Sequence, residues 1–282
     1  ILAMFVANIA PILIVAGVFI VYALAYGLTN PEFFGRLRYL VRNLFYTKEG
    51  IFSTPVNVCS KYIVVFIIFG AFLERTGISN FFIDLANCIA GRFAGGPAKV
   101  SVISSALCGM VSGSSVGNTV TTGSVTIPMM KKTGYKPEFA GAVEATSSTG
   151  GQIMPPIMGA AAFLMADFVG VPYSSIIGRA ILPAILYFAG IFISVHLEAK
   201  KLGLKGVSRS EMVPGKELLA KCYLLVPIVL LIVLVSLNVY TMQKAAALSI
   251  IAAIVVGVLN KDSRLTPAKF LEALEAGGKG TI

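Results

Sequence analysis

The chain has 282 residues, of which 56% are hydrophobic and 13% are charged, and its formal net charge is +10. Soluble domains carry about 25% charged residues, so this composition excludes an ordinary soluble protein. Apolar runs of helical length recur, whereas the ten-residue alternation typical of membrane β-barrels is not seen. The basic residues lie mostly in short segments between apolar runs, which indicates membrane topology rather than nucleic-acid binding. We predict an all-α polytopic membrane protein.

The apolar runs predict the crossings in chain order. Residues 1–28 form a transmembrane helix, which a basic cytoplasmic linker follows to about residue 50. In the scaffold segment 51–96, residues 54–73 leave the cytoplasm and residues 81–94 return. Residues 176–199, 218–237 and 245–259 add further crossings, which gives about six in all. The Lys/Arg-rich segments are assigned to the cytoplasm and the two loops without Lys or Arg to the outside: 29–54, 131–136, 200–221 and 261–279 inside, 170–175 and 238–242 outside.

A re-entrant helical hairpin is predicted at 99–131. From Ser112 to Thr126 the sequence has four Ser, four Thr, three Gly, one Asn and three Val, with no charge. Lys99 and Lys131 place both ends on one side of the membrane. The halves 99–112 and 119–130 would be about 21 and 18 Å long as helices, which is short of a core about 30 Å thick. The tip, 112–122, is therefore expected to turn near the midplane, where irregular backbone must line a cavity or be buried in protein.

A broken helix is predicted at 137–171. Gly150–Gly151 loosen the backbone, and Pro155–Pro156 remove two donors and stop the helix. A break at this depth frees carbonyls that can bind a cation and half-helix N-termini that favour an anion. The hairpin tip and the break at 148–156 together predict a transport site.

Several polar residues have competing interpretations. We interpret Ser101, Ser104, Ser105 and Gly109 as small residues for close helix packing. Glu144 is an ionisable group inside the membrane and therefore a candidate proton carrier, although pairing with a Lys or Arg would also explain it. The four cysteines lack metal-ligand spacing, and His196 is the single histidine. With no catalytic motif around these residues, we predict no enzyme activity.

The block "GMVSGSSVGNTVTTGSVTIPMMKKTGYKPEFAGAVEATSSTGGQIMPPIMGAAAFLMADFVGVPY" at 109–173 resembles the large membrane subunit of tripartite ATP-independent periplasmic (TRAP) transporters. Its "EATSSTGGQIMPPIMGAAAF" is similar to the branch with TAXI-type binding proteins, in which the small and large membrane subunits are often fused. The segments 69–109 and 196–206 fit too, so the resemblance covers roughly residues 50–282. It implies an elevator-type fold with two inverted repeats, each with one hairpin and one broken helix.

The resemblance also implies site residues. An ion site, with Na⁺ as one candidate, would be formed by Ser112, Gly113, Ser114, Asn118, Thr149, Gly150, Gly151 and Ile153. The substrate site would use Ser114, Ser115, Asn118, Thr119 and Gln152. Glu144 departs from the sodium-coupled branch, which usually has an uncharged residue there, and this makes H⁺ the other candidate coupling ion.

We therefore predict a permease that imports a small organic anion, a carboxylate or amino acid, driven by an ion gradient and without other cofactors. Its expected location is a bacterial or archaeal inner membrane. Its expected partners are a TAXI-type periplasmic binding protein and a small membrane subunit, either separate or fused. The moving portion would be 97–200 and the scaffold 1–95 with 217–260. Residues 201–282 would hold a cytoplasmic loop, two scaffold helices and the start of a second repeat, so we expect a fragment. A divalent-anion or citrate-type hairpin symporter that works without a binding protein is the alternative.

Overall fold

A computed structural model describes residues 2–26, 32–204, 206, 213–237, 240–260 and 263–281. The described residues are helical or loop, which agrees with the predicted all-α class. The chain divides into two compact units, 1–57 and 58–282. The predicted loop residues Lys205 and Arg209, and positions 238–239 of the predicted external loop, lie outside the described residues.

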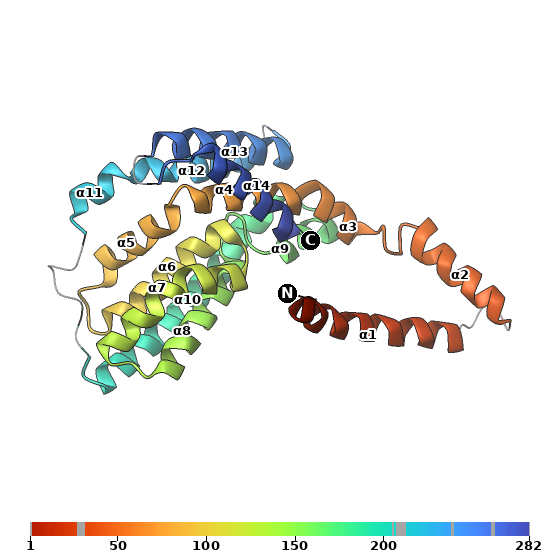
Figure 1. Cartoon of the computed structure of the whole chain (residues 1–282), viewed down its shortest axis with the longest axis horizontal. Helices are drawn as coiled ribbons and strands as arrows, with labels where there is room; N and C mark the ends of the chain where they lie inside the picture. Colours follow the sequence, from red (N-terminus) through yellow and green to blue (C-terminus); the bar gives the residue numbers. More distant parts are fainter. Residues whose placement is uncertain are drawn as a thin grey trace. The chain divides into compact units, whose positions relative to one another are not determined.

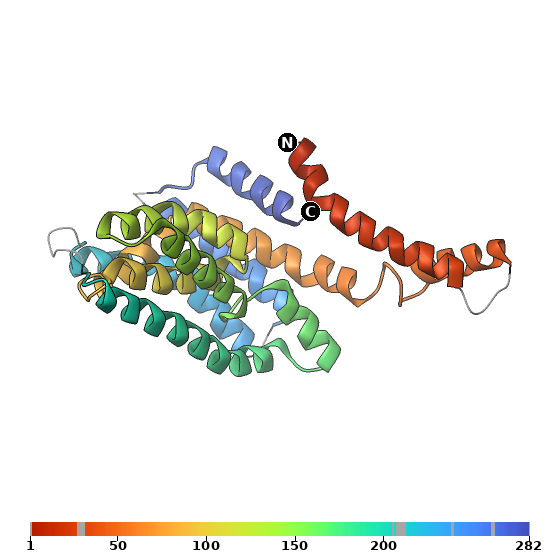
Figure 2. The same cartoon turned by 90° about the horizontal axis from the view of Figure 1, so that it is seen from below.

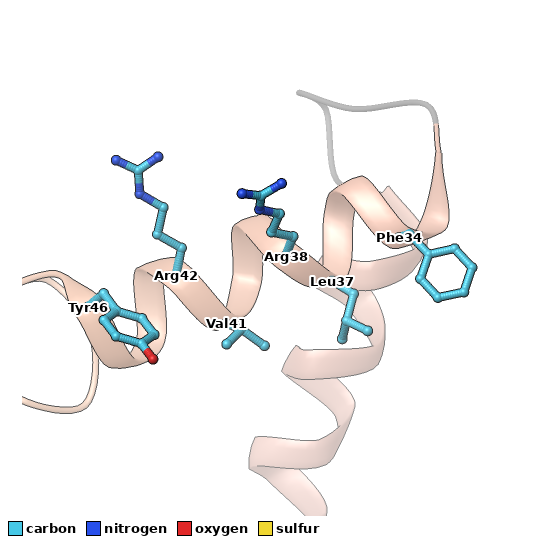
Figure 3. A pocket seen from close by; sticks show the side chains of 6 residues that line it. All are labelled: Phe34, Leu37, Arg38, Val41, Arg42 and Tyr46. Atoms are coloured by element: carbon cyan, nitrogen blue, oxygen red, sulfur yellow. The ribbon is translucent and has the colours of Figure 1, made fainter.

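The N-terminal unit contains α1 (Leu2–Tyr26) and α2 (Phe33–Tyr46). The Arg36 guanidinium donates to the carbonyls of Leu24 and Ala25 at 3.0 and 2.7 Å, so it caps the C-terminal end of α1. A hollow of about 810 Å³ runs along α2 (Figure 3). Arg38 and Arg42 extend to one side of this helix and Leu37 and Val41 to the other. This two-sided pattern is typical of helices that lie at a membrane surface.

The second unit begins at Val58, within a long helix. This helix consists of α3 (Thr54–Val58), the π-turn η1 (Cys59–Ile63) and α4 (Val64–Arg75). Gly77, whose φ of +83° suits glycine, separates it from α5 (Ile78–Ala90). The return crossing of 81–94 stays a prediction; in the structure, α5 lies beyond the end of α4 rather than beside it (Figures 1 and 2). The chain reverses later, at 91–95, and the next helix packs along α5.

The predicted hairpin is present as α6 (Gly96–Ser112) and α7 (Ser115–Thr133), which pack against each other. Its two outer ends meet: the Tyr135 hydroxyl lies 3.5 Å from the Gly95 carbonyl oxygen. Gly113, with φ +60°, makes the turn. The tip was expected to be irregular over 112–122, and this extent is wrong, because α7 is helical from Ser115 onward. At 17 and 19 residues the two helices are about 26 and 28 Å long, longer than the predicted halves.

Threonine side chains explain why the polar tip stays helical. The hydroxyls of Thr119, Thr121 and Thr122 each donate to the carbonyl four residues earlier, at 2.8, 2.9 and 2.8 Å. These bonds satisfy the hydroxyls within the helix, so the density of polar residues does not unwind it. At the start of α7, the Ser114 side chain accepts from the Gly117 N–H at 3.2 Å, as an N-cap does.

The predicted broken helix is confirmed as α8 (Pro137–Gly150), the short turn η2 (Gly151–Ile153) and α9 (Ala160–Val169). The peptide bond Pro155–Pro156 is cis, and Met158 has a φ of +58°. The helix α10 (Tyr173–Lys201) then runs back, and α6, α7, α8 and α10 form a bundle (Figures 1 and 2). A hydrophobic cluster around Met130, Tyr135 and Val195, separate from the main core of the protein, fills the end of this bundle.

The remaining helices are α11 (Gly215–Ala220), η4 (Cys222–Leu225), α12 (Val226–Ser236), α13 (Met242–Leu259) and α14 (Pro267–Thr281). Of these, α13 and α14 pack on α4, α12 packs on α13, and α11 contacts α5. The Asn260 side chain ties α13 to the end of α4 by donating to the Thr76 carbonyl at 2.7 Å. Gly277 and Gly280 let α14 approach Ile68 and Ile67 of α4. The main core, which includes Phe69, Phe72 and Leu231, lies among these helices.

Three described helices are long and apolar enough to cross a membrane: Thr54–Arg75, Tyr173–Lys201 and Met242–Leu259. Shorter apolar helices are Leu13–Ala25, Ile78–Ala90, Ala160–Val169 and Cys222–Ser236. This supports a polytopic membrane protein. The count of about six full crossings stays a prediction.

The hairpin and the broken helix touch through glycines. A Cβ on Gly109 would lie 2.3 Å from Gly151 Cα, closer than side-chain carbons approach backbone. We predict that Gly109→Ala lowers the free energy of unfolding by about 1–3 kcal/mol through overpacking. Thermal unfolding of the purified protein in detergent measures this. Gly141→Ala is the matched control, since nothing lies within 4 Å of its added Cβ. Equal melting temperatures for the two variants would contradict the close contact.

Candidate functional site

The tip of the hairpin rests on the break of the broken helix. A Cβ on Gly113 would lie 2.2 Å from the Met158 carbonyl oxygen, so only glycine fits this position without a shift. The Gln152 side-chain amide lies 3.2 Å from the Ser115 hydroxyl and can donate to it. Two irregular segments that are about 40 residues apart in the chain therefore meet at one place, as the predicted transport site requires.

A cavity of about 270 Å³ opens at this junction. Its walls come from the hairpin tip, the break, α4 and α14, and include Ser112, Ser114, Met158, Glu74 and Gly280. The N-terminus of α7 begins at Ser115, next to the lining residues 112–114, and that of α9 begins at Ala160, which itself lines the cavity. The N-terminal ends of two helices are thus close to the same space, and their positive dipole ends favour an anion.

Most of the predicted tip residues gather here. Ser112, Gly113 and Ser114 line the cavity, and Ser115 contacts Gln152. Thr119 uses its hydroxyl within α7, on the Ser115 carbonyl at 2.8 Å. The structure thus brings five of the predicted ion and substrate residues to one place, with Thr119 one turn further along the helix.

Three residues of the predicted ion site lie elsewhere. Gly150 faces α10, where an added Cβ would be 2.5 Å from the Tyr187 ring. Thr149 is exposed and donates to the Ala145 carbonyl at 2.8 Å, and the Ile153 side chain is exposed as well. Gly151, in contrast, faces Gly109 and lies near the Asn118 amide.

Three backbone carbonyls of the break already accept hydrogen bonds from other groups of the protein. The Tyr173 hydroxyl lies 3.0 Å from the Pro156 carbonyl oxygen and also contacts that of Ile157. The Gln152 carbonyl accepts from the Gly159 N–H at 2.7 Å. The break is therefore held in shape by tertiary hydrogen bonds, and these three carbonyls have less capacity to bind a cation than the sequence suggested.

Asn118 is a buried polar residue of the tip, with 1% of its surface exposed. Its side-chain N–H donates to the Ser105 carbonyl of α6 at 2.8 Å, which fixes the orientation of the amide. Its Oδ1 is buried and has no hydrogen-bond partner among the described residues. A buried acceptor without a partner is costly, so this oxygen is suited to bind something.

Glu144 of α8 is the most unusual group of the site. It is completely buried, and both carboxylate oxygens are surrounded by hydroxyls. The Ser101 and Thr126 hydroxyls donate to Oε2 at 2.7 and 2.5 Å, and those of Ser105 and Ser148 donate to Oε1 at 2.9 and 3.0 Å. The Thr122 hydroxyl also contacts Oε1. We call Glu144 and these five residues the Glu144 cluster.

The Glu144 cluster joins three helices, because its hydroxyls come from α6, α7 and α8. No salt bridge to Glu144 is found in the described part of the chain, so the alternative of a Lys or Arg partner is not supported there. Gly123 makes room for the carboxylate, since an added Cβ would lie 3.0 Å from Glu144 Cγ. Hydroxyl donors rather than an opposite charge solvate this group.

The assignment of Ser101 and Ser105 to helix packing missed this role. The sequence does carry a signal for it: the hydroxyls lie four residues apart on each hairpin helix, at 101/105 and 122/126, and Ser148 lies four residues after Glu144. Residues with this spacing share one helix face. Three such faces converge on a single carboxylate, but only the packing shows that they do. No group of metal-ligating His, Cys, Asp or Glu residues occurs in the described ranges.

The Glu144 cluster should contribute strongly to stability. We predict that Glu144→Ala lowers the free energy of unfolding by about 3 kcal/mol, because it leaves a cavity and removes the carboxylate acceptor of the buried Ser101, Ser105 and Ser148 hydroxyls. Glu138→Ala, an exposed carboxylate in the first turn of α8, is the matched control. Thermal unfolding in detergent would compare the two. If Glu144→Ala melts at as high a temperature as the control, the hydrogen bonds of the Glu144 cluster do not stabilise the fold.

Comparison with known proteins identifies the family. The family model "Tripartite ATP-independent periplasmic transporter, DctM component" matches residues 1–282. The C4-dicarboxylate TRAP transporter large permease protein DctM of Pseudomonas aeruginosa is 26% identical over 239 residues, 82% of this chain and 54% of that protein. An uncharacterised protein of Sinorhizobium fredii is 28% identical over 220 residues, 77% of this chain and 51% of that protein.

The isethionate TRAP transporter permease protein DctMQ of Oleidesulfovibrio alaskensis is 28% identical over 223 residues, 75% of this chain and 33% of that protein. The chain spans about half the length of the first two relatives and a third of this one. The family match covers the entire chain, including the hairpin and the broken helix that build the site. The chain belongs to the DctM family, the large permease component of tripartite ATP-independent periplasmic transporters.

Proposed function

We propose that this chain is part of the permease of a secondary transporter that imports a small organic anion, driven by an ion gradient. The observation that carries the proposal is the 270 Å³ cavity at which the hairpin tip, the helix break and two helix N-termini converge. Two relatives are named for small organic anions, a C4-dicarboxylate and isethionate. Helix N-termini and hydroxyls at the tip would bind such an anion.

The partners follow from the family and the resemblance. A periplasmic binding protein, of the TAXI type, would deliver the substrate at the inner membrane, and a small membrane subunit, either separate or fused, would complete the permease. The alternative symporter without a binding protein is not favoured, because the family model that matches is that of a binding-protein-dependent system. In this proposal the hairpin is re-entrant, and residues 97–200 move as an elevator against 1–95 and 217–260.

Two coupling ions are compatible with the site. Na⁺ would bind at the hairpin tip and the adjoining break. H⁺ would bind at Glu144, whose cluster can adapt to both protonation states. The Thr122 and Thr126 hydroxyls lie 2.8 and 3.0 Å from the carbonyls of Asn118 and Thr122. Each hydroxyl can therefore donate to its own helix instead of to the carboxylate, and its oxygen can then accept a hydrogen bond from the O–H of a neutral Glu144.

Uptake under imposed gradients tests the function. The complete transporter in proteoliposomes with its binding protein should accumulate a labelled C4-dicarboxylate under a Na⁺ or an H⁺ gradient. If H⁺ is the coupling ion, Glu144→Gln should abolish uptake, because an amide cannot carry the proton. If Na⁺ is the coupling ion, uptake should survive Glu144→Gln. A panel of small organic anions that gives no uptake under either gradient would contradict the transporter proposal.

Asn118 tests the role of the tip. We predict that Asn118→Ala lowers uptake to background, because it removes the buried amide that joins the tip to α6 and offers a free oxygen. Membrane insertion should be unchanged, as measured by the amount of protein in the membrane fraction. Ser124→Ala, which removes an exposed hydroxyl of α7, is the control and should retain uptake. Normal uptake by Asn118→Ala would remove the tip from the site.

A further inference from the structure

A hollow of about 330 Å³ lies between the start of α6 and the last turns of α10, at the lysine-rich end of the bundle. Its lining residues are Phe93, Lys99, Phe192, Ile193 and His196. The lining is therefore mostly apolar, with one lysine and one histidine as its polar side chains. None of these residues lines the 270 Å³ cavity, so the hollow is separate from the proposed transport site.

Lys99 is a buried cation in this hollow, with 4% of its surface exposed. Its ammonium lies 3.0 Å from His196 Nδ1 and can donate one hydrogen bond to it. An ammonium has three N–H donors, yet Lys99 has no further hydrogen bond and no salt bridge within the described ranges. A buried charge without a counter-ion is costly, so Lys99 is suited to bind an anion in the hollow that it lines.

Aromatic rings, rather than a carboxylate, surround the ammonium. Lys99 Nζ lies 5.3 Å from the centroid of the Phe192 ring and 5.8 Å from that of the Phe93 ring. Such cation–π contacts stabilise the charge in part and leave it available to an anion. The Arg92 guanidinium lies over the same Phe93 ring, at 5.2 Å from its centroid, and brings a second positive charge to the mouth of the hollow.

The end of α10 adds to the positive charge. Lys200 is exposed and lies four residues after His196, so the two side chains share one face of this helix. The carboxylate at this helix end, Glu198, pairs with Lys201 at 3.4 Å. The cationic surroundings of the hollow therefore remain unbalanced in the part of the chain that the structure describes.

The rim of the hollow is apolar and open. The side chains of Phe93 and Ile193 are 49% and 58% exposed, and Leu197, one turn after Ile193, is 60% exposed. Ile193 and Leu197 lie on α10, which is long and apolar enough to cross a membrane. Exposed apolar side chains on such a helix face lipid chains. The hollow thus combines a cationic floor with an apolar rim, as a molecule with an anionic head and an apolar tail requires.

We propose that this hollow binds an anionic phospholipid of the phosphatidylglycerol type. The headgroup phosphate accepts hydrogen bonds from Lys99, and one acyl chain lies along Phe93 and Ile193. Basic pockets between transmembrane helices on the cytoplasmic side are suited to anionic headgroups, and the positive-inside rule predicts that this end of the bundle is cytoplasmic. The lipid bridges α6 and α10 and supplies the counter-ion that Lys99 lacks.

Lipid binding to the purified protein tests the site. Native mass spectrometry of the delipidated complete transporter in detergent gives the affinities for added phosphatidylglycerol and for zwitterionic phosphatidylcholine. The wild type should prefer phosphatidylglycerol. Lys99→Met should lower the affinity for the tightest-bound phosphatidylglycerol by about tenfold or more, because it removes the charge that binds the phosphate. Lys132→Met, which removes an exposed lysine from the last turn of α7, is the matched control and should bind like the wild type.

A second variant keeps the test decisive if Lys99→Met does not fold, as its melting temperature would show. His196→Glu places a carboxylate beside the ammonium, so Lys99 would be neutralised from within and phosphatidylglycerol binding should weaken. Wild-type affinity for phosphatidylglycerol in either folded variant, or equal affinity of the wild type for both lipids, overturns the inference. Radiolabelled inorganic phosphate that binds through Lys99, without a preference for phosphatidylglycerol, would assign the hollow to a free phosphate and overturn the lipid assignment.

Discussion

The bonds between Glu144 and five hydroxyls are the constraint on which the arrangement of the site depends. A carboxylate that is fully withdrawn from solvent must be solvated by the protein. Here the solvating groups come from both hairpin helices and from the first half of the broken helix. Because every hydroxyl has to reach the same two carboxylate oxygen atoms, the positions of α6, α7 and α8 along one another are fixed in one registry. That registry places the tip of the hairpin on the break.

Glycines set how closely these helices can approach once the registry is fixed. Gly109 and Gly151 bring the backbones of α6 and the break into contact, and Gly113 brings the tip against Met158. Tyr173 then binds the carbonyls that the break exposes. The site is thus a rigid junction.

Electrostatics around the junction is asymmetric. Helix N-termini favour an anion in the 270 Å³ cavity, while the Glu74 carboxylate in its wall opposes one. The affinity of this cavity for an anion therefore depends on the balance between the two.

The sequence by itself determined the membrane class, the hairpin, the broken helix and the tip residues, because hydropathy, Gly/Pro breaks and charge placement are local signals. It misjudged the extent of the irregular tip, since threonine hydroxyls that bond back to their own helix are compatible with a helix. The direction of α5 depended on a single glycine, Gly77, and Gly150 turned out to face α10. Tertiary packing alone decided that Ser101 and Thr126 converge on Glu144, and that Lys99 lies against His196 between α6 and α10. These contacts join residues 18 to 97 positions apart, and their geometry depends on how the helices cross.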